Sequence, residues 1–248
     1  MRTTTFFAGV VALVPFILPG VSSAENRVMF FGDSNTWGQV PFEGNDPGSR
    51  FDAGTRWTGI AGIALGEDYT VIEEGLPGRT AGSDDPSLPM ISGAGMNGAE
   101  YLSAAVATST PLDMVVIMLG TNDVKTSFEL SVLDISHDIL GLAIEASQNT
   151  GVGSSYEPAD VLVVAPPPLG EIADIHEFPS MFNEDAVEQS LELANVLGPL
   201  VESAGFNFFD AGSVIPSMDG ADGVHLTPAS HEELGKAIAA EIVRIKGE

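Results

Sequence analysis

The stretch MVVIMLGTND, residues 114–123, joins six consecutive apolar residues to a short polar motif. A short run that is apolar on both alternating faces is typical of a strand buried in a parallel sheet with both faces covered. Four other runs have the same character and strand-like length. The five predicted strands are Val28–Phe31, Tyr69–Ile72, Met114–Leu119, Val161–Ala165 and Phe206–Phe209.

Helix-like stretches lie between these strands. They cover Trp57–Leu65, Gly98–Ala107, Leu130–Gln148 and Asp185–Ala204, and a last helix is predicted from Pro228, with Thr227 as its N-cap, to about Ile245. Alternating strands and helices with short links predict an α/β fold, a three-layer α/β/α arrangement around a doubly wound, five-stranded parallel sheet. We expect a single domain over residues 25–248.

Residues 1–24 read as an export signal rather than as part of the fold. Arg2 precedes the almost wholly apolar segment Phe6–Val21, and Ser22-Ser23-Ala24 offers small residues for cleavage. An uncleaved membrane anchor is the alternative, but Pro15 and Pro19 interrupt a run that is short for a bilayer span of roughly 20 residues. We therefore expect a secreted or periplasmic protein with no stable membrane association after signal cleavage.

The charge balance limits the partners of the chain. Its 35 Asp and Glu residues outnumber its 9 Lys and Arg residues, for a net charge of −26. Such a surface disfavours nucleic acid and anionic lipid as partners. The chain has no cysteine, which excludes disulfides and a thiolate nucleophile. A small-molecule substrate remains the expected partner, and the sequence leaves open whether the protein forms a homo-oligomer.

Polar motifs follow the predicted strands. Ser34 comes after the first strand, Gly78 after the second and Asn122 after the third, while Asp222 and His225 lie on the loop beyond the fifth. In open parallel sheets, ligands bind beyond the carboxyl ends of the strands, where the strand order reverses. We therefore expect these residues to meet at one edge of the sheet.

Their chemistry suits acyl transfer. A serine hydroxyl needs a base as it attacks, and histidine is the usual base. Asp222 is three residues from His225, so one turn can bring its carboxylate to Nδ1 and leave Nε2 facing Ser34.

An oxyanion intermediate also needs hydrogen-bond donors. Ser34 and Gly78 could each supply a backbone N–H and Asn122 a side-chain N–H, with Gly75 as an alternative to Gly78.

Four ordered blocks carry a family resemblance: Gly32-Asp33-Ser34, Glu74–Thr80, Gly120-Thr121-Asn122-Asp123 and Asp222-Gly223-Val224-His225. They resemble the nucleophile, glycine, asparagine and histidine blocks of the SGNH, or GDSL-type, hydrolases. The stretches Gly32–Gly38, Val71–Thr80, Ile117–Asp123 and Val161–Pro168 look most like the bacterial arylesterase and acyltransferase branch.

The resemblance implies a flavodoxin-like fold and hydrolysis of small short-chain or aryl esters through an acyl-enzyme, with acyl transfer to alcohols as a further capacity. It implies no metal and no cofactor. Two positions depart from that branch: Glu74 replaces a frequent asparagine, and Gln39 replaces a second tryptophan. The loss of an apolar residue at position 39 weakens the extrapolation to acyl transfer.

Several alternatives remain at this point. A carbohydrate acetyl esterase or a lysophospholipase would share the fold and the motifs, and a non-catalytic carbohydrate- or lipid-binding module could retain the fold alone. The Gly93–Gly98 segment spells a dinucleotide-binding pattern, but no credible strand precedes it, so we expect a mobile loop near the acyl pocket. The acids around Asp219 and Asp222 lack EF-hand spacing.

The remaining polar residues are assigned supporting roles. His137, His176 and His231 are expected at the surface or in packing, and Asp33 and Asp123 in hydrogen bonds to the loops. Asp210 could compete with Asp222 but lacks the close spacing to His225. We expect the pocket walls to come from Phe42–Phe51, Ala81–Gly98 and Leu169–Phe182.

Overall fold

A computed structural model describes residues 26–44, 48–85, 93–149 and 156–247. The predicted signal peptide, residues 1–24, therefore lies outside the described residues. Each predicted strand is present, with shifts at the ends. The strands are β1 (Asn26–Gly32), β2 (Tyr69–Gly75), β3 (Met114–Met118), β4 (Asp160–Ala165) and β5 (Asn207–Asp210).

All neighbouring strands pair in parallel, in the order β2-β1-β3-β4-β5. The chain moves from β1 outward to β2, then crosses to the other side of β1 to form β3, so the order reverses between β1 and β3. This is the switch point at which the ends of neighbouring strands leave room for a ligand. In the pairing register, Gly32 at the end of β1 lies between Gly75 of β2 and Met118 of β3.

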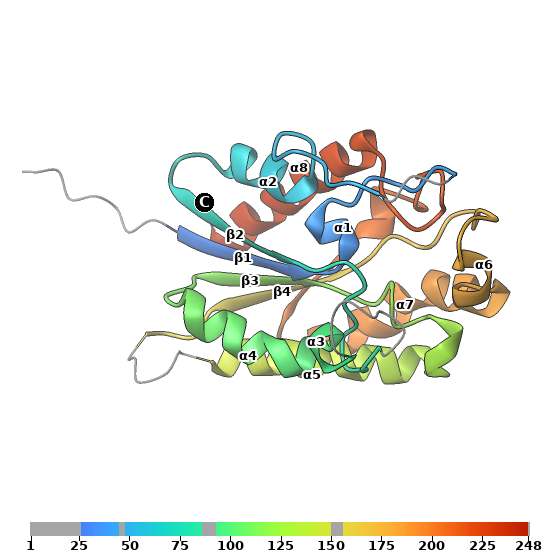
Figure 1. Cartoon of the computed structure of the whole chain (residues 1–248). Helices are drawn as coiled ribbons and strands as arrows, with labels where there is room; N and C mark the ends of the chain where they lie inside the picture. Colours follow the sequence, from blue (N-terminus) through green and yellow to red (C-terminus); the bar gives the residue numbers. More distant parts are fainter. Residues whose placement is uncertain (1–25, 45–47, 86–92, 150–155, 248) are drawn as a thin grey trace, which may run out of the picture.

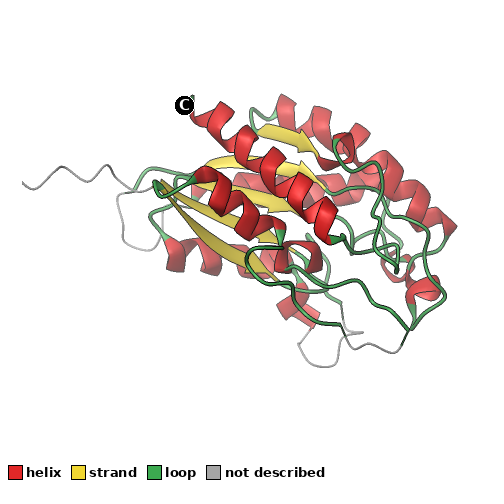
Figure 2. Ribbon diagram, turned by 90° about the horizontal axis from the view of Figure 1, so that it is seen from above, coloured by secondary structure: helices red, strands yellow, loops and turns green. Residues whose placement is uncertain are grey.

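Helices cover both faces of the sheet. The longer ones are α2 (Trp57–Leu65), α4 (Gly98–Ser109), α5 (Val132–Gln148), α7 (Glu184–Ser203) and α8 (Pro228–Lys246). Figure 1 shows α2 and α8 on one face and α4 and α5 on the other, and α7 packs against α5. Figure 2 shows the same sheet from above, between its helical layers. The three-layer α/β/α prediction is confirmed.

The apolar runs are buried as their pattern predicts. Every residue of β3 is at most 1% exposed, and β1 is fully buried from Val28 to Gly32. β2 is half-buried throughout, because it is an edge strand. Among the described residues, no helix is long and apolar enough to cross a membrane.

Capping residues in the sequence mark the starts of several helices. Thr227 caps α8 and Pro228 is its first residue, as predicted, and Ser131 with Asp134 forms a capping box at α5. One prediction is wrong: residues 93–96 form a short helix, α3 (Gly93–Met96), rather than a loop. Asn97 then caps α4 by accepting a hydrogen bond from the amide of Ala99, and this local cap starts the next helix.

Candidate active site

Ser34 stands at the end of the central strand β1. It is the first residue of the short helix α1 (Ser34–Trp37), and Asp33 caps that helix by accepting a 2.9 Å hydrogen bond from the amide of Asn35. Gly32 permits this sharp exit from the strand, since a Cβ there would lie 2.6 Å from the carbonyl oxygen of Met118. The missing side chain thus lets α1 approach the sheet closely.

Ser34, His225 and Asp222 form a continuous chain of contacts. His225 Nε2 lies 3.0 Å from Ser34 Oγ, and His225 Nδ1 lies 2.7 Å from Asp222 Oδ2. The ionised carboxylate of Asp222 can only accept, so Nδ1 carries the proton and Nε2 faces the hydroxyl as an acceptor. This arrangement allows the imidazole to remove the proton of Ser34 as it attacks.

The Asp222 carboxylate is fully buried and is held by backbone amides. Oδ1 accepts hydrogen bonds of 2.9 Å from the amides of Val224 and His225, and Oδ2 accepts one of 2.7 Å from the amide of Phe42. Burial alone would raise the pKa of Asp222, but the hydrogen bond and charge of His225 and the backbone donors outweigh it and lower the pKa. The group therefore stays ionised as the partner of the imidazole.

Asn35 joins the nucleophile helix to the histidine loop, a role that the sequence did not predict. It is fully buried, donates from Nδ2 to the carbonyl oxygen of Val224 at 3.1 Å, and accepts at Oδ1 from the amide of Leu226 at 3.1 Å. These two bonds flank His225 in the chain. They fix the histidine loop against the residue that follows Ser34.

The three predicted oxyanion donors line one pocket with His225. Gly78 has a left-handed backbone with φ 84°, which favours glycine. Asn122 donates one side-chain N–H to the carbonyl oxygen of Arg79 at 3.1 Å, which orients its amide and leaves its second N–H for another acceptor.

Gly75, the alternative to Gly78, sits elsewhere. It is the last residue of β2 and packs on the backbone of Trp37. Gly78, and not Gly75, is among the residues that line the pocket.

The pocket itself is small, with a volume of about 200 Å³. Its walls are mainly apolar and are formed by Phe42, Pro77, Phe178, Met181, Phe182 and Val224, with Gln39 and Lys125 as further polar lining. The predicted walls Phe42–Phe51 and Leu169–Phe182 each contribute. Of Ala81–Gly98, residues 86–92 lie outside the described part, and the others do not line this pocket. Instead, Asp85 reaches it indirectly through a buried 3.0 Å ion pair with Lys125.

The predicted supporting hydrogen bonds of Asp33 and Asp123 are present. Asp33 caps α1, and Asp123 Oδ1 accepts a 2.7 Å bond from the amide of Ala81. Burial raises the pKa of both carboxyls, that of Asp123 to about 7. Asp210 instead accepts a hydrogen bond from the amide of Gly212 at the end of β5.

The other three histidines lie in the packed interior or at the surface, as predicted. His231 is fully buried, and its Nδ1 accepts a 3.2 Å hydrogen bond from the amide of Trp57. His137 and His176 are exposed, and the His176 ring lies against Phe42 at the pocket rim. Among the described residues, no group of three or more acidic or histidine side chains could hold a metal ion.

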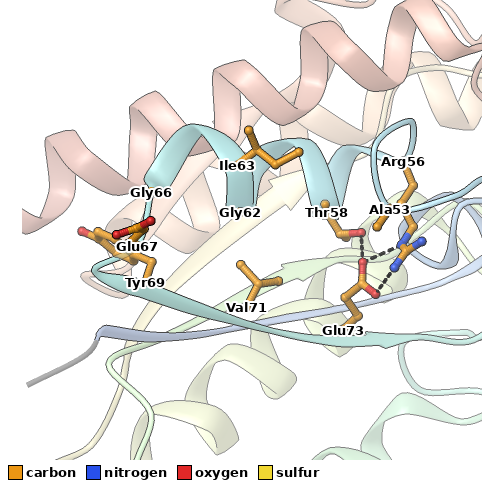
Figure 3. A pocket seen from close by; sticks show the side chains of 11 residues that line it. Ala53, Arg56, Thr58, Gly62, Ile63, Gly66, Glu67, Tyr69, Val71 and Glu73 are labelled. Atoms are coloured by element: carbon orange, nitrogen blue, oxygen red, sulfur yellow. Dashed lines mark hydrogen bonds and ion pairs between the residues drawn. The ribbon is translucent and has the colours of Figure 1, made fainter.

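A larger groove of about 680 Å³ lies between α2 and the edge strand β2 (Figure 3). Its polar centre is Glu73, which accepts two 2.6 Å hydrogen bonds from the Arg56 guanidinium and another from the Thr58 hydroxyl. These bonds and the charge of Arg56 outweigh burial and lower the pKa of Glu73. The cluster anchors α2 to β2. The described residues that line this groove include no serine, cysteine or histidine, so the smaller pocket is the candidate active site.

Comparisons with known proteins identify a matching family and similar solved structures. The family model for GDSL-like lipases and acylhydrolases matches residues 28–238. An aryl esterase of M. smegmatis is 44% identical, with a TM-score of 0.82 over 88% of this chain and 99% of that one. A carbohydrate acetylesterase from Sinorhizobium meliloti is 39% identical, with a TM-score of 0.82 over 89% of this chain and 99% of that one. No curated protein sequence matches the chain.

Proposed function

Since the chain belongs to the GDSL-like lipase/acylhydrolase family and is a carboxylic ester hydrolase, we propose that it cleaves short-chain or aryl esters with a Ser34–His225–Asp222 triad. The observation that carries the proposal is the chain of contacts from Ser34 Oγ through His225 to Asp222, 3.0 Å and 2.7 Å long, beside the pocket.

In the proposed reaction, His225 takes the hydroxyl proton as Ser34 attacks the ester carbonyl. The amides of Ser34 and Gly78 and the free N–H of Asn122 hold the oxyanion. His225 then gives the proton to the leaving alcohol, and an acyl-enzyme remains. Water attacks the acyl-enzyme by the same route and releases the acid. An alcohol that replaces water in this second step would give acyl transfer.

The size of the pocket supports a short acyl chain. A volume of about 200 Å³ bounded by Phe42, Phe178 and Phe182 suits a small acyl group better than a long one. We therefore expect turnover of p-nitrophenyl esters to be highest for acetate and to fall as the chain lengthens.

A carbohydrate acetyl ester is the second candidate substrate. The similar carbohydrate acetylesterase from S. meliloti supports it, and so do Gln39 and Lys125, which add polar groups to an otherwise apolar pocket. Faster deacetylation of an acetylated oligosaccharide than of p-nitrophenyl acetate, by kcat/KM, would favour this candidate.

The deciding experiment compares the wild-type protein with Ser34→Ala on p-nitrophenyl acetate, together with labelling by a serine-directed phosphonate. We expect the variant to fold, to lose turnover and to resist labelling. A folded Ser34→Ala protein with wild-type turnover would contradict the triad. Adding an alcohol acceptor to the wild-type reaction and measuring the ester product tests acyl transfer separately.

A further inference from the structure

Arg79 is a buried cation beside the candidate active site. It is 3% exposed, and in the described part of the chain no carboxylate forms an ion pair with it. Burial lowers its pKa to about 10, opposed by the nearby negative charge of Glu74, so it remains charged at neutral pH. A buried charge without an ion pair is costly unless it makes other strong interactions.

The guanidinium makes its interactions with backbone carbonyls and aromatic rings. Nη1 donates to the carbonyl oxygen of Gly32 at 3.0 Å and to that of Glu74. The group also lies over the ring of Phe31 at 4.2 Å and that of Tyr101 at 5.1 Å. Gly32 ends β1 two residues before Ser34, and Glu74 lies in β2 four residues before Gly78. One nitrogen thus joins the two strand ends from which the nucleophile and the glycine loop depart.

The backbone of Arg79 contacts the remaining parts of the oxyanion site. Its carbonyl oxygen accepts the 3.1 Å hydrogen bond that orients the Asn122 amide. Its N–H donates to the carbonyl oxygen of Leu76 at 3.0 Å and closes the turn that carries Gly78, while the amide of Leu76 donates to Gly32 at 3.0 Å. Residue 79 is therefore bonded to the segments that position all three proposed donors.

We propose that Arg79 is the positioning residue of the oxyanion hole and fixes the spacing of the Ser34, Gly78 and Asn122 donors. Its guanidinium does so through hydrogen bonds to Gly32 and Glu74, and its backbone carbonyl through the hydrogen bond from Asn122. The inference rests on the proposed function. Oxyanion donors act only when they lie within about 2.7–3.1 Å of the developing charge. A change that loosens their spacing should weaken transition-state binding more than substrate binding.

The experiment compares Arg79→Met and Arg79→Lys with Arg27→Met. Arg27 is a matched control, because its guanidinium also donates to two backbone carbonyls, those of Pro111 and Ser109. It lies near the start of β1, at the opposite end of the strand from Ser34. For each protein we would measure kcat and KM on p-nitrophenyl acetate, the melting temperature, and the inhibition constant of a trifluoromethyl ketone that forms a tetrahedral adduct on serine.

We expect Arg79→Met to lower kcat by about 10²-fold, the loss that a misplacement on the order of 1 Å can cause, with KM nearly unchanged. The ketone should bind more weakly by a similar factor. Arg79→Lys keeps the positive charge, so it should lose less kcat than Arg79→Met. It cannot place a donor where Nη1 lies, so its kcat should still fall below that of the wild type. Arg27→Met should keep wild-type kcat and ketone affinity.

Two results would overturn the inference. One is a kcat loss in Arg79→Met no larger than in Arg27→Met, and the other is a kcat loss with unchanged ketone affinity, which would indicate fewer active molecules rather than a displaced oxyanion hole. If Arg79→Met does not fold, a folded Arg79→Lys protein with wild-type kcat overturns it. An active Ser34→Ala protein would refute the triad, whereas an inactive Ser34→Ala beside a fully active Arg79→Met refutes only the role of Arg79.

Discussion

Asp222→Asn provides the sharpest test of the triad, because the structure identifies four hydrogen-bond donors to the Asp222 carboxylate. In the wild-type protein, Oδ1 accepts from the amides of Val224 and His225, and Oδ2 accepts from the amide of Phe42 and from His225 Nδ1. An asparagine amide has one oxygen and one NH₂ group. Whichever way it turns, two of these four donors face another donor.

The favoured orientation keeps the oxygen on the two amides of its own loop. The NH₂ group then faces Phe42 N and His225 Nδ1, which drives the imidazole to the tautomer with its proton on Nε2. In that tautomer the ring cannot take the proton of Ser34, and kcat should fall by about 10⁴-fold, as when the orienting acid of a serine protease triad is changed to its amide.

The stability change should be much smaller than the activity change. The partly buried N–H of Phe42 loses its acceptor, which costs at most about 1–3 kcal/mol. In a domain of this size, each kcal/mol lowers Tm by roughly 2–4 °C. The variant should therefore remain folded at 25 °C.

Asp219→Asn is the matched control for the Asp222 variant. Asp219 lies three residues earlier and accepts from the amide of Thr227 at 3.2 Å and from its hydroxyl at 2.7 Å, but it does not contact the His225 ring. We would measure kcat for p-nitrophenyl acetate and Tm for both variants. The reasoning is refuted if Asp222→Asn keeps kcat within about 10-fold of the wild type, where the tautomer argument requires about 10⁴-fold. It is also refuted if Asp219→Asn loses as much kcat.

Two further predictions concern the surroundings of the site. Burial raises the pKa of Asp123 to about 7, against about 3.9 in an unfolded chain. Between these two pH values the folded state binds more protons than the unfolded state. The contribution of this carboxyl to the free energy of unfolding therefore decreases as pH rises through that window. Asp123→Asn keeps an acceptor for the amide of Ala81 and does not titrate, so its Tm relative to the wild type should increase from pH 4 to pH 8; a pH-independent difference would contradict this. A Cβ on Gly75 would lie 2.3 Å from the Trp37 amide nitrogen, so Gly75→Ala should cost about 1–3 kcal/mol in urea unfolding and lower kcat by shifting α1. Gly141→Ala is the control, because Gly141 lies in α5 with open space around it. This variant should raise the free energy of unfolding by about 0.5–1 kcal/mol at unchanged kcat. If it instead destabilises the protein as much as Gly75→Ala, the clash with α1 is not the cause of the Gly75→Ala loss.

Much of the fold could be predicted because its signals are local. The runs that form β1 and β3 are apolar on both faces, and this pattern follows directly from burial on both sides of the sheet. Thr227 and Pro228 likewise mark the start of α8 in the sequence itself. The loop predicted over Gly93–Gly98 is wrong for residues 93–96, which form α3. The prediction rested on the lack of a preceding strand, which argues against a dinucleotide site but does not exclude a helical turn.

The candidate site shows the same division between local and distant interactions. The sequence alone determined the order of the motifs and the short spacing of Asp222 and His225, since both are properties of neighbouring residues. Only the tertiary structure decided that Asn35 holds the histidine loop, that the amide of Phe42 reaches Asp222, and that Arg79 joins two strand ends. These hydrogen bonds connect residues far apart in the chain. The partner of a buried polar group depends on how the helices and strands pack together, and the local sequence pattern does not contain that information.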